Sequence, residues 1–462
     1  MTEAPVARGR RWRDDLGERF QILPLPSASR RTGVVGRTIP KLGGRDAGME
    51  HRILLNDGGY VQLPEHLRRR WGLTPGAELE IQETPEGLQL RPTDPPLAKV
   101  YVEPTSACNL NCPVCVRNAW DEPTGTMAMA TYRRLVDGLR DVPSLRTMAF
   151  WGLGEPLLHP EIVEMVAAAT RLGAETELIT NAVLLDRETA KGLVTAGLDL
   201  LVVSVEGSSS ESHAGVQSGT DLAVVQENVA ELRAARRDSG GDKPEIGIEF
   251  VLTRRNASRL PDLRRLARSM GASLILVTNV MPYTKEFREE IAYWLSVGGL
   301  YSSTRSKWSP EIVLPRVDAR REYLEPLMTL LRRGGGIGPL AEGSDRREAY
   351  CRFVEKGAVA VAWDGGVSPC VPLMHSYTGY VLGREKRIQR YRLGNVSQEE
   401  IADIWGRDEY VQFRARVREF DFSPCVDCGG CQWAESNEED CFGNPFPVCG
   451  DCLWARGVIL CP

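Results

Sequence analysis

The chain has 462 residues and a formal net charge of −5, with 42% hydrophobic and 26% charged residues. This length allows two to four domains with sizeable cores, and the charge gives no general attraction to nucleic acid or to an anionic membrane. No apolar run approaches the about 18 residues of a transmembrane helix, and MTEAPVARGRRWRDD lacks the apolar segment of a secretory signal. We therefore expect a cytoplasmic protein, whose twelve cysteines serve metal ligation or redox chemistry rather than disulfides.

The first part of the chain shows two different patterns. Residues 1–46 are rich in Arg, Gly, Ser and Pro, and we expect a flexible basic arm. Residues 51–93 alternate in the way of short strands, with turns at 56–59, 75–76 and 85–87, and a short helix fits 64–71. This segment resembles the AbrB-like swapped-hairpin domain, which forms dimers and often binds DNA. It lacks a basic footprint for nucleic acid, so dimerisation or partner docking is the expected role, and nucleic acid is not the expected partner.

The middle of the chain, from about residue 98 to 281, alternates regularly between apolar runs and amphipathic segments. Runs that are apolar on both faces and separated by helices predict parallel strands joined by right-handed crossovers. The predicted strands are 98–104, 146–152, 174–181, 198–207, 244–253 and 272–280. The predicted helices are 131–140, 160–172, 187–196, 221–237 and 258–270. This pattern indicates an α/β fold, either a doubly wound sheet or a partial barrel.

The remainder of the chain is less regular. We expect residues 282–345 to be a helical connector, with a hinge at GGGIG, 334–338. The part from 346 to 462 is dominated by cysteine, and AVAVAWDGGVSPC predicts a hairpin that turns at Asp364 and Gly365.

The stretch CNLNCPVC, 108–115, places three cysteines in a loop directly after the first predicted strand. The Cys-x3-Cys-x2-Cys spacing lets one loop present thiolates to three corners of a four-iron cluster, and it leaves the fourth iron open for a ligand. Structural zinc usually takes four ligands in two separated pairs, and this loop supplies three. The loop resembles the signature of the radical S-adenosylmethionine (radical SAM) family. Val114 departs from that signature, since the family usually carries an aromatic residue there.

This resemblance implies a partial (β/α)6 TIM barrel of the radical SAM type over 98–281, with its active site at the C-terminal ends of the strands. It also implies a [4Fe–4S] cluster bound by Cys108, Cys112 and Cys115. In the family the reduced cluster passes an electron to S-adenosylmethionine, and the resulting 5′-deoxyadenosyl radical removes a hydrogen atom from a substrate. No general base is assigned, because hydrogen-atom abstraction need not use one, and the catalytic residues stay unknown.

Other predicted strand ends carry residues that match the family's cofactor-binding positions. WGLGEP, 151–156, is similar to the family's GGEP motif, with Leu153 inserted, and its glutamate would accept a hydrogen bond from the amino group of S-adenosylmethionine. The resemblance assigns S-adenosylmethionine binding to Gly152, Gly154, Glu155, Pro156, Asn181, Ser204, Glu206 and Glu249. Four residues flank the cysteine loop and would either face a substrate or brace the barrel: Arg117, Asn118, Trp120 and Asp121.

The C-terminal cysteines form a second group. They are Cys351, Cys370, Cys425, Cys428, Cys431, Cys441, Cys449, Cys452 and Cys461. The spacing of Gly365 and Cys370 and the repeated Cys-x2-Cys pairs resemble the SPASM extension of radical SAM enzymes, which implies two auxiliary [4Fe–4S] clusters in 346–462. Zinc in a ribbon-like fold stays open, because the same pairs support it.

By analogy with that extension, the first auxiliary cluster would take Cys351, Cys370, Cys452 and either Cys431 or Cys441. The second would take Cys425, Cys428, Cys449 and Cys461. Spacing alone does not decide this division.

The AbrB-like front, the segment YVEPTSACNLNCPVCVRNAWDEP and the tail CQWAESNEEDCFGNPFPVCGDCLWARGVILCP together resemble the radical maturases of tungsten-containing aldehyde oxidoreductases. That resemblance spans 51–462 and implies action on the oxidoreductase or on its tungsten–pterin cofactor, with a low-potential ferredoxin or flavodoxin as electron donor and a possible homodimer. One alternative is a radical enzyme that modifies a precursor peptide. Another is a regulator with a DNA-binding front and an iron–sulfur redox sensor, which the missing basic patch disfavours.

Overall fold

The computed structural model describes residues 63–70, 73, 79–84, 87–120, 122–205, 221–294, 300–302, 311–332, 337–339, 350–426 and 431–461. The predicted flexible arm lies outside these residues, as does all of 51–62. None of the described helices is long and apolar enough to cross a membrane.

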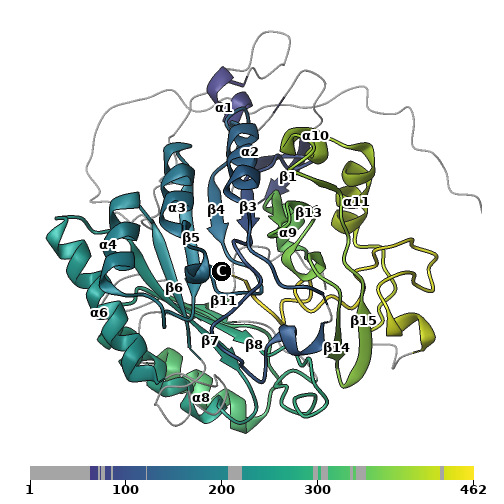
Figure 1. The fold of residues 1–462 in the computed structure, drawn as a ribbon. Helices are drawn as coiled ribbons and strands as arrows, with labels where there is room; N and C mark the ends of the chain where they lie inside the picture. The colour runs from purple at the N-terminus through teal and green to yellow at the C-terminus, as the bar shows by residue number, and fades with distance from the viewer. Residues whose placement is uncertain are drawn as a thin grey trace, which may run out of the picture. The chain divides into compact units, whose positions relative to one another are not determined.

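The predicted parallel strands are all present (Figure 1). They are β3 Lys99–Val102, β4 Thr147–Phe150, β5 Glu175–Thr180, β6 Leu200–Val205, β7 Glu245–Leu252 and β8 Leu274–Asn279. Each strand pairs in parallel with the next in chain order. β3 and β8 end this run and do not pair with each other, so the β/α units form a partial barrel that stays open.

The crossover helices also match the prediction within a few residues. They are α2 Met129–Leu139, α3 Ile162–Arg171, α4 Arg187–Ala196, α6 Leu222–Asp238 and α7 Leu263–Met270. In α2 the buried residues Tyr132, Leu135, Val136 and Leu139 recur at helical spacing and face the core. The last predicted helix begins as a 3-10 turn, η3 Ala257–Asp262, because Pro261 cannot donate a backbone hydrogen bond.

Short strands extend the sheet at both ends, so that twelve strands among the described residues share it. At the β3 edge, β12 Ala358–Val361 pairs in parallel with β3, and β13 Gly366–Ser368 and β16 Gly394–Asn395 follow. β12 and β13 form the predicted hairpin, and Gly365 adopts a φ of +82° at its turn. The C-terminal region therefore continues the barrel sheet.

At the β8 edge lie β10 Glu311–Val313, β9 Leu300–Ser302 and β11 Ile337–Pro339. Residues 282–345 are therefore not a purely helical connector, since they supply these strands as well as α8 Arg321–Arg332. Two residues of the predicted hinge, 337 and 338, belong to β11. The strands escaped prediction because each has three residues, too few to show periodicity.

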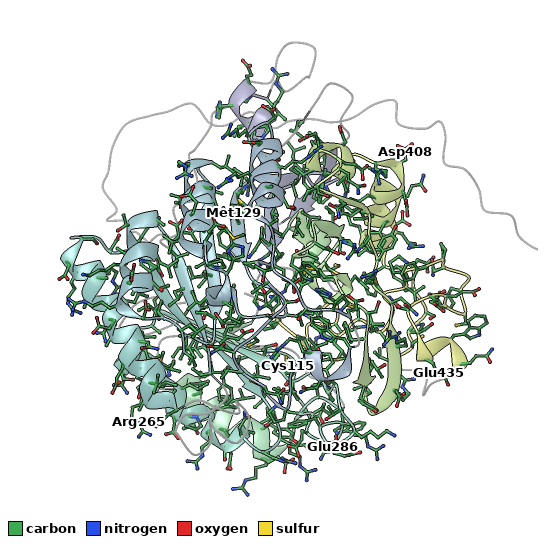
Figure 2. The ribbon with its side chains drawn as sticks, viewed as in Figure 1. Cys115, Met129, Arg265, Glu286, Asp408 and Glu435 are labelled. Carbon is green, nitrogen blue, oxygen red and sulfur yellow. The ribbon has the colours of Figure 1, made fainter. Side chains whose placement is uncertain are left out.

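The remaining elements are short. α1 Glu65–Arg70 agrees with the predicted helix near 64–71, and β1 Leu79–Thr84 pairs with β2 Gly87–Pro92 as an antiparallel hairpin. In the C-terminal region, α9 Arg352–Glu355, α10 Ile401–Trp405 and α11 Asp408–Glu419 accompany a separate hairpin of β14 Tyr377–Val381 and β15 Arg384–Ile388. In Figure 2 the exposed charged side chains of Arg265, Glu286, Asp408 and Glu435 lie at the margin, whereas Cys115 lies toward the centre.

Candidate functional site

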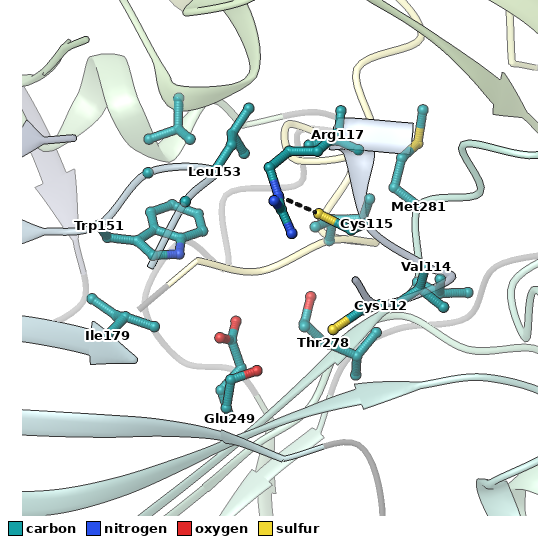
Figure 3. A pocket seen from close by; sticks show the side chains of 18 of the residues that line it. Cys112, Val114, Cys115, Arg117, Trp151, Leu153, Ile179, Glu249, Thr278 and Met281 are labelled. Carbon is teal, nitrogen blue, oxygen red and sulfur yellow. Dashed lines mark hydrogen bonds between the residues drawn. The ribbon is translucent and has the colours of Figure 1, made fainter. Parts of the chain in front are cut away.

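A cavity of about 270 Å³ opens at the C-terminal ends of the parallel strands (Figure 3). All three sulfur-bearing residues of the CNLNCPVC loop line it, together with the WGLGEP loop and the ends of β5 to β8. From these predicted positions the cavity receives Cys108, Cys112, Cys115, Gly152, Gly154, Glu155, Asn181, Ser204 and Glu249. Pro156 is buried beside it and begins the turn η2 Pro156–Leu158, and Glu206 lies outside the described residues.

The cysteine loop is held by its own polar groups. The backbone amide of Leu110 lies 3.4 Å from the Cys108 sulfur, and Arg117 Nε lies 3.3 Å from the Cys115 sulfur. Arg117 also donates to the Leu110 carbonyl at 2.7 Å. Burial raises the pKa of Cys108, while the Leu110 amide and the Arg117 charge oppose that rise. The loop thus turns its sulfurs toward the cavity and places N–H donors and one cation beside them, an arrangement that suits thiolates.

The WGLGEP loop lies against the cysteine loop with no room for further side-chain atoms. A Cβ on Gly154 would stand 2.2 Å from the Thr105 carbonyl oxygen, and one on Gly152 would stand 2.4 Å from the side chain of Glu103. The Glu155 amide donates to the Ala107 carbonyl at 2.8 Å. These glycines are therefore required by the contact between the two loops, in addition to the predicted approach of a cofactor.

The Glu155 carboxylate is buried and accepts three internal hydrogen bonds. Its donors are the Leu157 amide at 3.0 Å, the Thr180 hydroxyl at 2.6 Å and the Asn181 amide at 2.8 Å. Burial raises its pKa, and these donors counteract that rise. The side chain joins the WGLGEP loop to the end of β5. Its predicted hydrogen bond to an amino group stays a prediction, and it would use the remaining lone pair.

Asn181 connects the end of β5 to the cysteine loop. Its side-chain amide donates to the Asn109 side chain at 2.9 Å and lies 3.8 Å from the Cys108 sulfur. Its side-chain oxygen accepts from the Val183 amide at 2.9 Å. A polar side chain was predicted here, and the structure shows that this one touches the cysteine loop itself.

Glu249 lies on β7 and projects into the cavity beneath Arg117 and the cysteines (Figure 3). It is 7% exposed, and burial raises its pKa to about 7. No hydrogen-bond donor or ion-pair partner faces its carboxylate among the residues that the structure describes. A buried carboxyl group without a partner is costly when ionised, so this group is suited to meet a cationic ligand or to exchange a proton.

The residues that flank the cysteine loop divide between two roles. Arg117 lines the cavity, whereas Trp120 packs against His375, with ring centroids 4.6 Å apart. Asn118 is exposed and donates to the Cys112 carbonyl at 2.8 Å, which braces the loop. Asp121 lies outside the described residues.

Several cavity residues were not assigned to the site from the sequence. Tyr283, Tyr377 and Trp454 line the cavity, and the rings of Tyr283 and Tyr377 meet edge to face with centroids 5.5 Å apart. They come from the connector and the C-terminal region, so the cysteine-rich part of the chain helps to form the wall of the cavity. No local motif marks any of the three, because segments that are distant in the sequence bring them here.

Four of the C-terminal cysteines are half-buried and lie near one another, and the other described ones differ in exposure. Burial raises the pKa of Cys351, Cys370, Cys449 and Cys452, and for the first three their mutual charges raise it further. Cys431 and Cys441 are exposed, whereas Cys425 is buried and its sulfur lies 3.1 Å from the Ser423 hydroxyl. Cys428 lies outside the described residues. Cys449 therefore lies with Cys351, Cys370 and Cys452, which differs from the expected division.

Cys461 lies near the cavity. Burial raises its pKa, and the neighbouring charges on Glu249 and Cys452 contribute, while Trp454 Nε1 donates to its sulfur at 3.1 Å. It was expected in a set with Cys425, and its sulfur is close to the cavity carboxylate of Glu249 and to Cys452.

These donors fit iron–sulfur clusters. The three loop sulfurs share one cavity, N–H groups face two of them, and a separate half-buried set supplies four thiols. Among the described residues no three His, Cys, Asp or Glu side chains converge as the ligands of a single metal ion do. A four-iron cluster has different requirements, because each thiolate binds its own iron.

Comparisons with known proteins agree with this chemistry. Residues 102–242 match the model of the Radical SAM superfamily, and residues 351–432 match that of SPASM, an iron–sulfur cluster-binding domain. A relative from Pyrococcus furiosus, the tungsten-containing aldehyde ferredoxin oxidoreductase cofactor-modifying protein, is 31% identical over 79% of this chain and 96% of its own.

Two other matches are more distant. The PqqA peptide cyclase of Gluconobacter oxydans is 30% identical over 46% of this chain and 57% of its own. The structure of Streptococcus suis SuiB bound to S-adenosylmethionine covers 72% of this chain and 71% of its own, with 16% identity and a TM-score of 0.46.

Proposed function

The chain belongs to the radical SAM superfamily, in the SPASM-bearing family of its Pyrococcus relative, and from this premise we propose that it is a maturase of a tungsten-containing oxidoreductase. One observation supports the chemistry above all. The three loop cysteines, the WGLGEP loop and the ends of β5 to β8 line a single cavity. We assign the SAM-binding [4Fe–4S] cluster to Cys108, Cys112 and Cys115, at the mouth of the partial barrel.

When bound and reduced, such a cluster supplies one electron to S-adenosylmethionine, which gives methionine and a 5′-deoxyadenosyl radical that removes a hydrogen atom from the substrate. The protein must bind the cofactor in one orientation and exclude water and other hydrogen donors. Residues 152–156 and Asn181 would contact the amino acid part of S-adenosylmethionine, whereas Ser204, Glu206 and Glu249 would lie toward its nucleoside. Tyr283, Tyr377 and Trp454 add aromatic surface to the cavity wall, which would help to exclude water from the bound cofactor.

The C-terminal cysteines would bind two auxiliary clusters, and the structure leads us to revise their division. Cys351, Cys370, Cys449 and Cys452 would form the first set, because the charges of the other three all act on Cys370. The second set draws on Cys425, Cys428, Cys431 and Cys441, and Cys461 joins either set or faces the substrate. Four thiolates saturate a four-iron cluster, so the first set would move electrons rather than bind a ligand.

The substrate assignment follows the Pyrococcus relative, whose name states that it modifies the cofactor of a tungsten-containing aldehyde ferredoxin oxidoreductase. The match covers nearly all of that relative, so the proposal takes in its substrate as well as its fold: the oxidoreductase or its tungsten–pterin cofactor. A low-potential ferredoxin or flavodoxin would donate the electron in the cytoplasm. Residues 51–93, as an AbrB-like module, would dimerise the protein or dock the oxidoreductase, and 346–462 would be the SPASM domain.

Peptide modification is the second candidate, because peptide cyclases are also among the relatives. The deciding experiment supplies the reduced, reconstituted protein and S-adenosylmethionine with a tungsten oxidoreductase isolated from cells that lack this protein. The expected result is 5′-deoxyadenosine coupled to a mass change in the pterin cofactor. A mass change in a polypeptide with an unaltered cofactor would favour peptide modification instead.

A further inference from the structure

His375 lies in the C-terminal region, buried between two carboxylates that belong to the barrel region. Its Nδ1 atom is 2.9 Å from a carboxylate oxygen of Glu122, and its Nε2 atom is 2.8 Å from one of Glu103. The imidazole is 2% exposed and Glu103 is fully buried. Trp120 packs against the ring at 4.6 Å. The sequence assigned no role to His375, Glu103 or Glu122, and the proposed radical chemistry does not use them directly.

The two hydrogen bonds favour a charged imidazole. A neutral histidine carries one N–H and one acceptor nitrogen, whereas an ionised carboxylate only accepts. Both ring nitrogens face carboxylate oxygens, so an imidazolium can donate to Glu103 and Glu122 at the same time. Burial alone would lower the pKa of His375, but its hydrogen bonds to Glu103 and Glu122 and their charges raise it overall. The other charged group that faces this arrangement is Arg390, 3.4 Å from Glu122.

The carboxylates stand at the two ends of the cysteine loop. Glu103 follows β3 and precedes Cys108, and Glu122 follows Cys115 and the turn η1 Val116–Ala119. Glu122 also accepts from the Ser376 amide at 2.8 Å, which fixes it to the same C-terminal segment. One imidazolium therefore holds both ends of the segment that carries the three cysteines.

Glu103 extends the connection to the other cavity loop. Its second oxygen accepts from the Leu153 amide at 3.0 Å, within WGLGEP, and its side chain lies where a Cβ on Gly152 would collide. Its first oxygen also lies 3.3 Å from the Trp363 amide, at the turn between β12 and β13. The same carboxylate thus contacts the C-terminal hairpin, the WGLGEP loop and His375.

We propose that His375 is a positioning residue that, as an imidazolium, holds the cysteine loop and the WGLGEP loop in register with the cysteine-rich region. It lets that region determine the geometry of the S-adenosylmethionine cavity without touching the cofactor. The inference rests on the proposed function for its readout, since S-adenosylmethionine is the ligand measured.

The first test compares His375→Gln with Arg414→Gln, a matched control. Arg414 is another buried cation, paired with Asp94 at 2.6 Å, in the α11 region. We expect His375→Gln to raise the dissociation constant of S-adenosylmethionine about 10- to 100-fold, the usual cost of losing a partner that orients a metal ligand. We also expect it to alter the electron paramagnetic resonance spectrum of the reduced loop cluster and to speed hydrogen exchange at the Leu153 amide. Arg414→Gln should lower thermal stability and leave these three readouts unchanged.

The second test uses pH and does not depend on His375→Gln being folded. In the wild type, the affinity for S-adenosylmethionine should fall as alkaline pH deprotonates His375, because a neutral imidazole cannot donate to both carboxylates. Glu122→Gln removes the need for the second donor, so this alkaline fall should disappear.

Unchanged affinity and spectrum in His375→Gln, equal losses in both buried-cation variants, or an alkaline fall that persists in Glu122→Gln would each overturn the positioning role. A wild type that binds no S-adenosylmethionine would instead overturn the proposed function.

Discussion

The two cysteine-bearing regions of this protein reach their sites by different routes. Cys108, Cys112 and Cys115 lie on one loop between β3 and α2, and the ends of the regular strands β5 to β8 form a large part of their cavity. The half-buried C-terminal set joins Cys351 and Cys370 to Cys449 and Cys452 from the far end of the chain, where few regular elements occur. The barrel site depends on its scaffold, whereas the C-terminal set depends on individual polar and apolar contacts between loops.

We expect the largest loss of folding stability in the C-terminal region, when its buried ion pair is broken. Lys386 Nζ lies 2.7 Å from both carboxylate oxygens of Asp451, the residue before Cys452, and both side chains are nearly inaccessible. Asp451→Ala leaves a buried cation without a partner, which should cost about 3–5 kcal/mol of folding free energy. Thermal unfolding measures it.

The exposed pair Arg171 and Glu164 in the barrel region is the control, and Arg171→Ala should change stability by less than about 0.5 kcal/mol. Similar losses for the two substitutions would contradict the view that single contacts stabilise the C-terminal region.

The next largest effect is expected on the affinity for S-adenosylmethionine, from the contact between the WGLGEP loop and the cysteine loop. Gly154→Ala places a Cβ against the backbone at Thr105 and Ala107, so the loops must separate. We expect the affinity for S-adenosylmethionine to fall about 100-fold, in line with the cost of a displacement near 1 Å. Equilibrium binding to the reconstituted protein measures this.

Gly240→Ala provides its control, because Gly240 has a φ of +69° and open space around its Cβ position. It should lose only about 1 kcal/mol of stability from backbone strain and bind S-adenosylmethionine normally. Normal binding by Gly154→Ala would mean that the loops move freely.

The smallest change in affinity for S-adenosylmethionine is expected from the protonation of Glu249. Burial raises its pKa from 4.5 to about 7, so the carboxyl group is protonated below that pH and ionised above it. Affinity for the cationic S-adenosylmethionine should therefore increase as pH rises through about 7, by about tenfold for each unit by which the bound ligand lowers that pKa. Stability of the ligand-free protein should change the other way, because the folded state binds more protons between pH 4.5 and 7 and loses that advantage as pH rises.

Glu249→Gln should abolish the rise in affinity for S-adenosylmethionine through about pH 7. It should keep the fall in affinity at alkaline pH that we assign to His375. Isothermal titration calorimetry with S-adenosylmethionine from pH 6 to 9 measures both changes in affinity. If the rise in affinity around pH 7 survived in Glu249→Gln, that rise would belong to another titrating group.

The same contrast explains what could be predicted from the sequence. The strands and helices of the barrel were predicted within a few residues, because parallel strands are apolar on both faces and their helices repeat at 3.6 residues. The resemblance to the radical SAM family assigned Asn181, Ser204 and Glu249 to the site, and all three line the cavity with the cysteine loop, because strand ends share one edge. The strands β9 to β11 were missed, because three residues carry no period.

The C-terminal region could not be predicted in the same way. The position of Cys449 beside Cys351 depends on how loops fold back, and spacing does not encode that path. The same limit applies to Tyr377 and Trp454 in the cavity wall and to His375 between Glu103 and Glu122, since each meets residues far away in sequence.

The most direct test of the account is iron content and 5′-deoxyadenosine formation, measured together after anaerobic reconstitution. It compares the wild type with Cys108/Cys112/Cys115→Ala and with Cys351/Cys370→Ala. We predict about twelve irons in the wild type and about four fewer in each variant. Only the first variant should lose 5′-deoxyadenosine formation with dithionite and S-adenosylmethionine. If the first variant kept all its iron, or still formed 5′-deoxyadenosine, the barrel cavity would not be the radical-generating site.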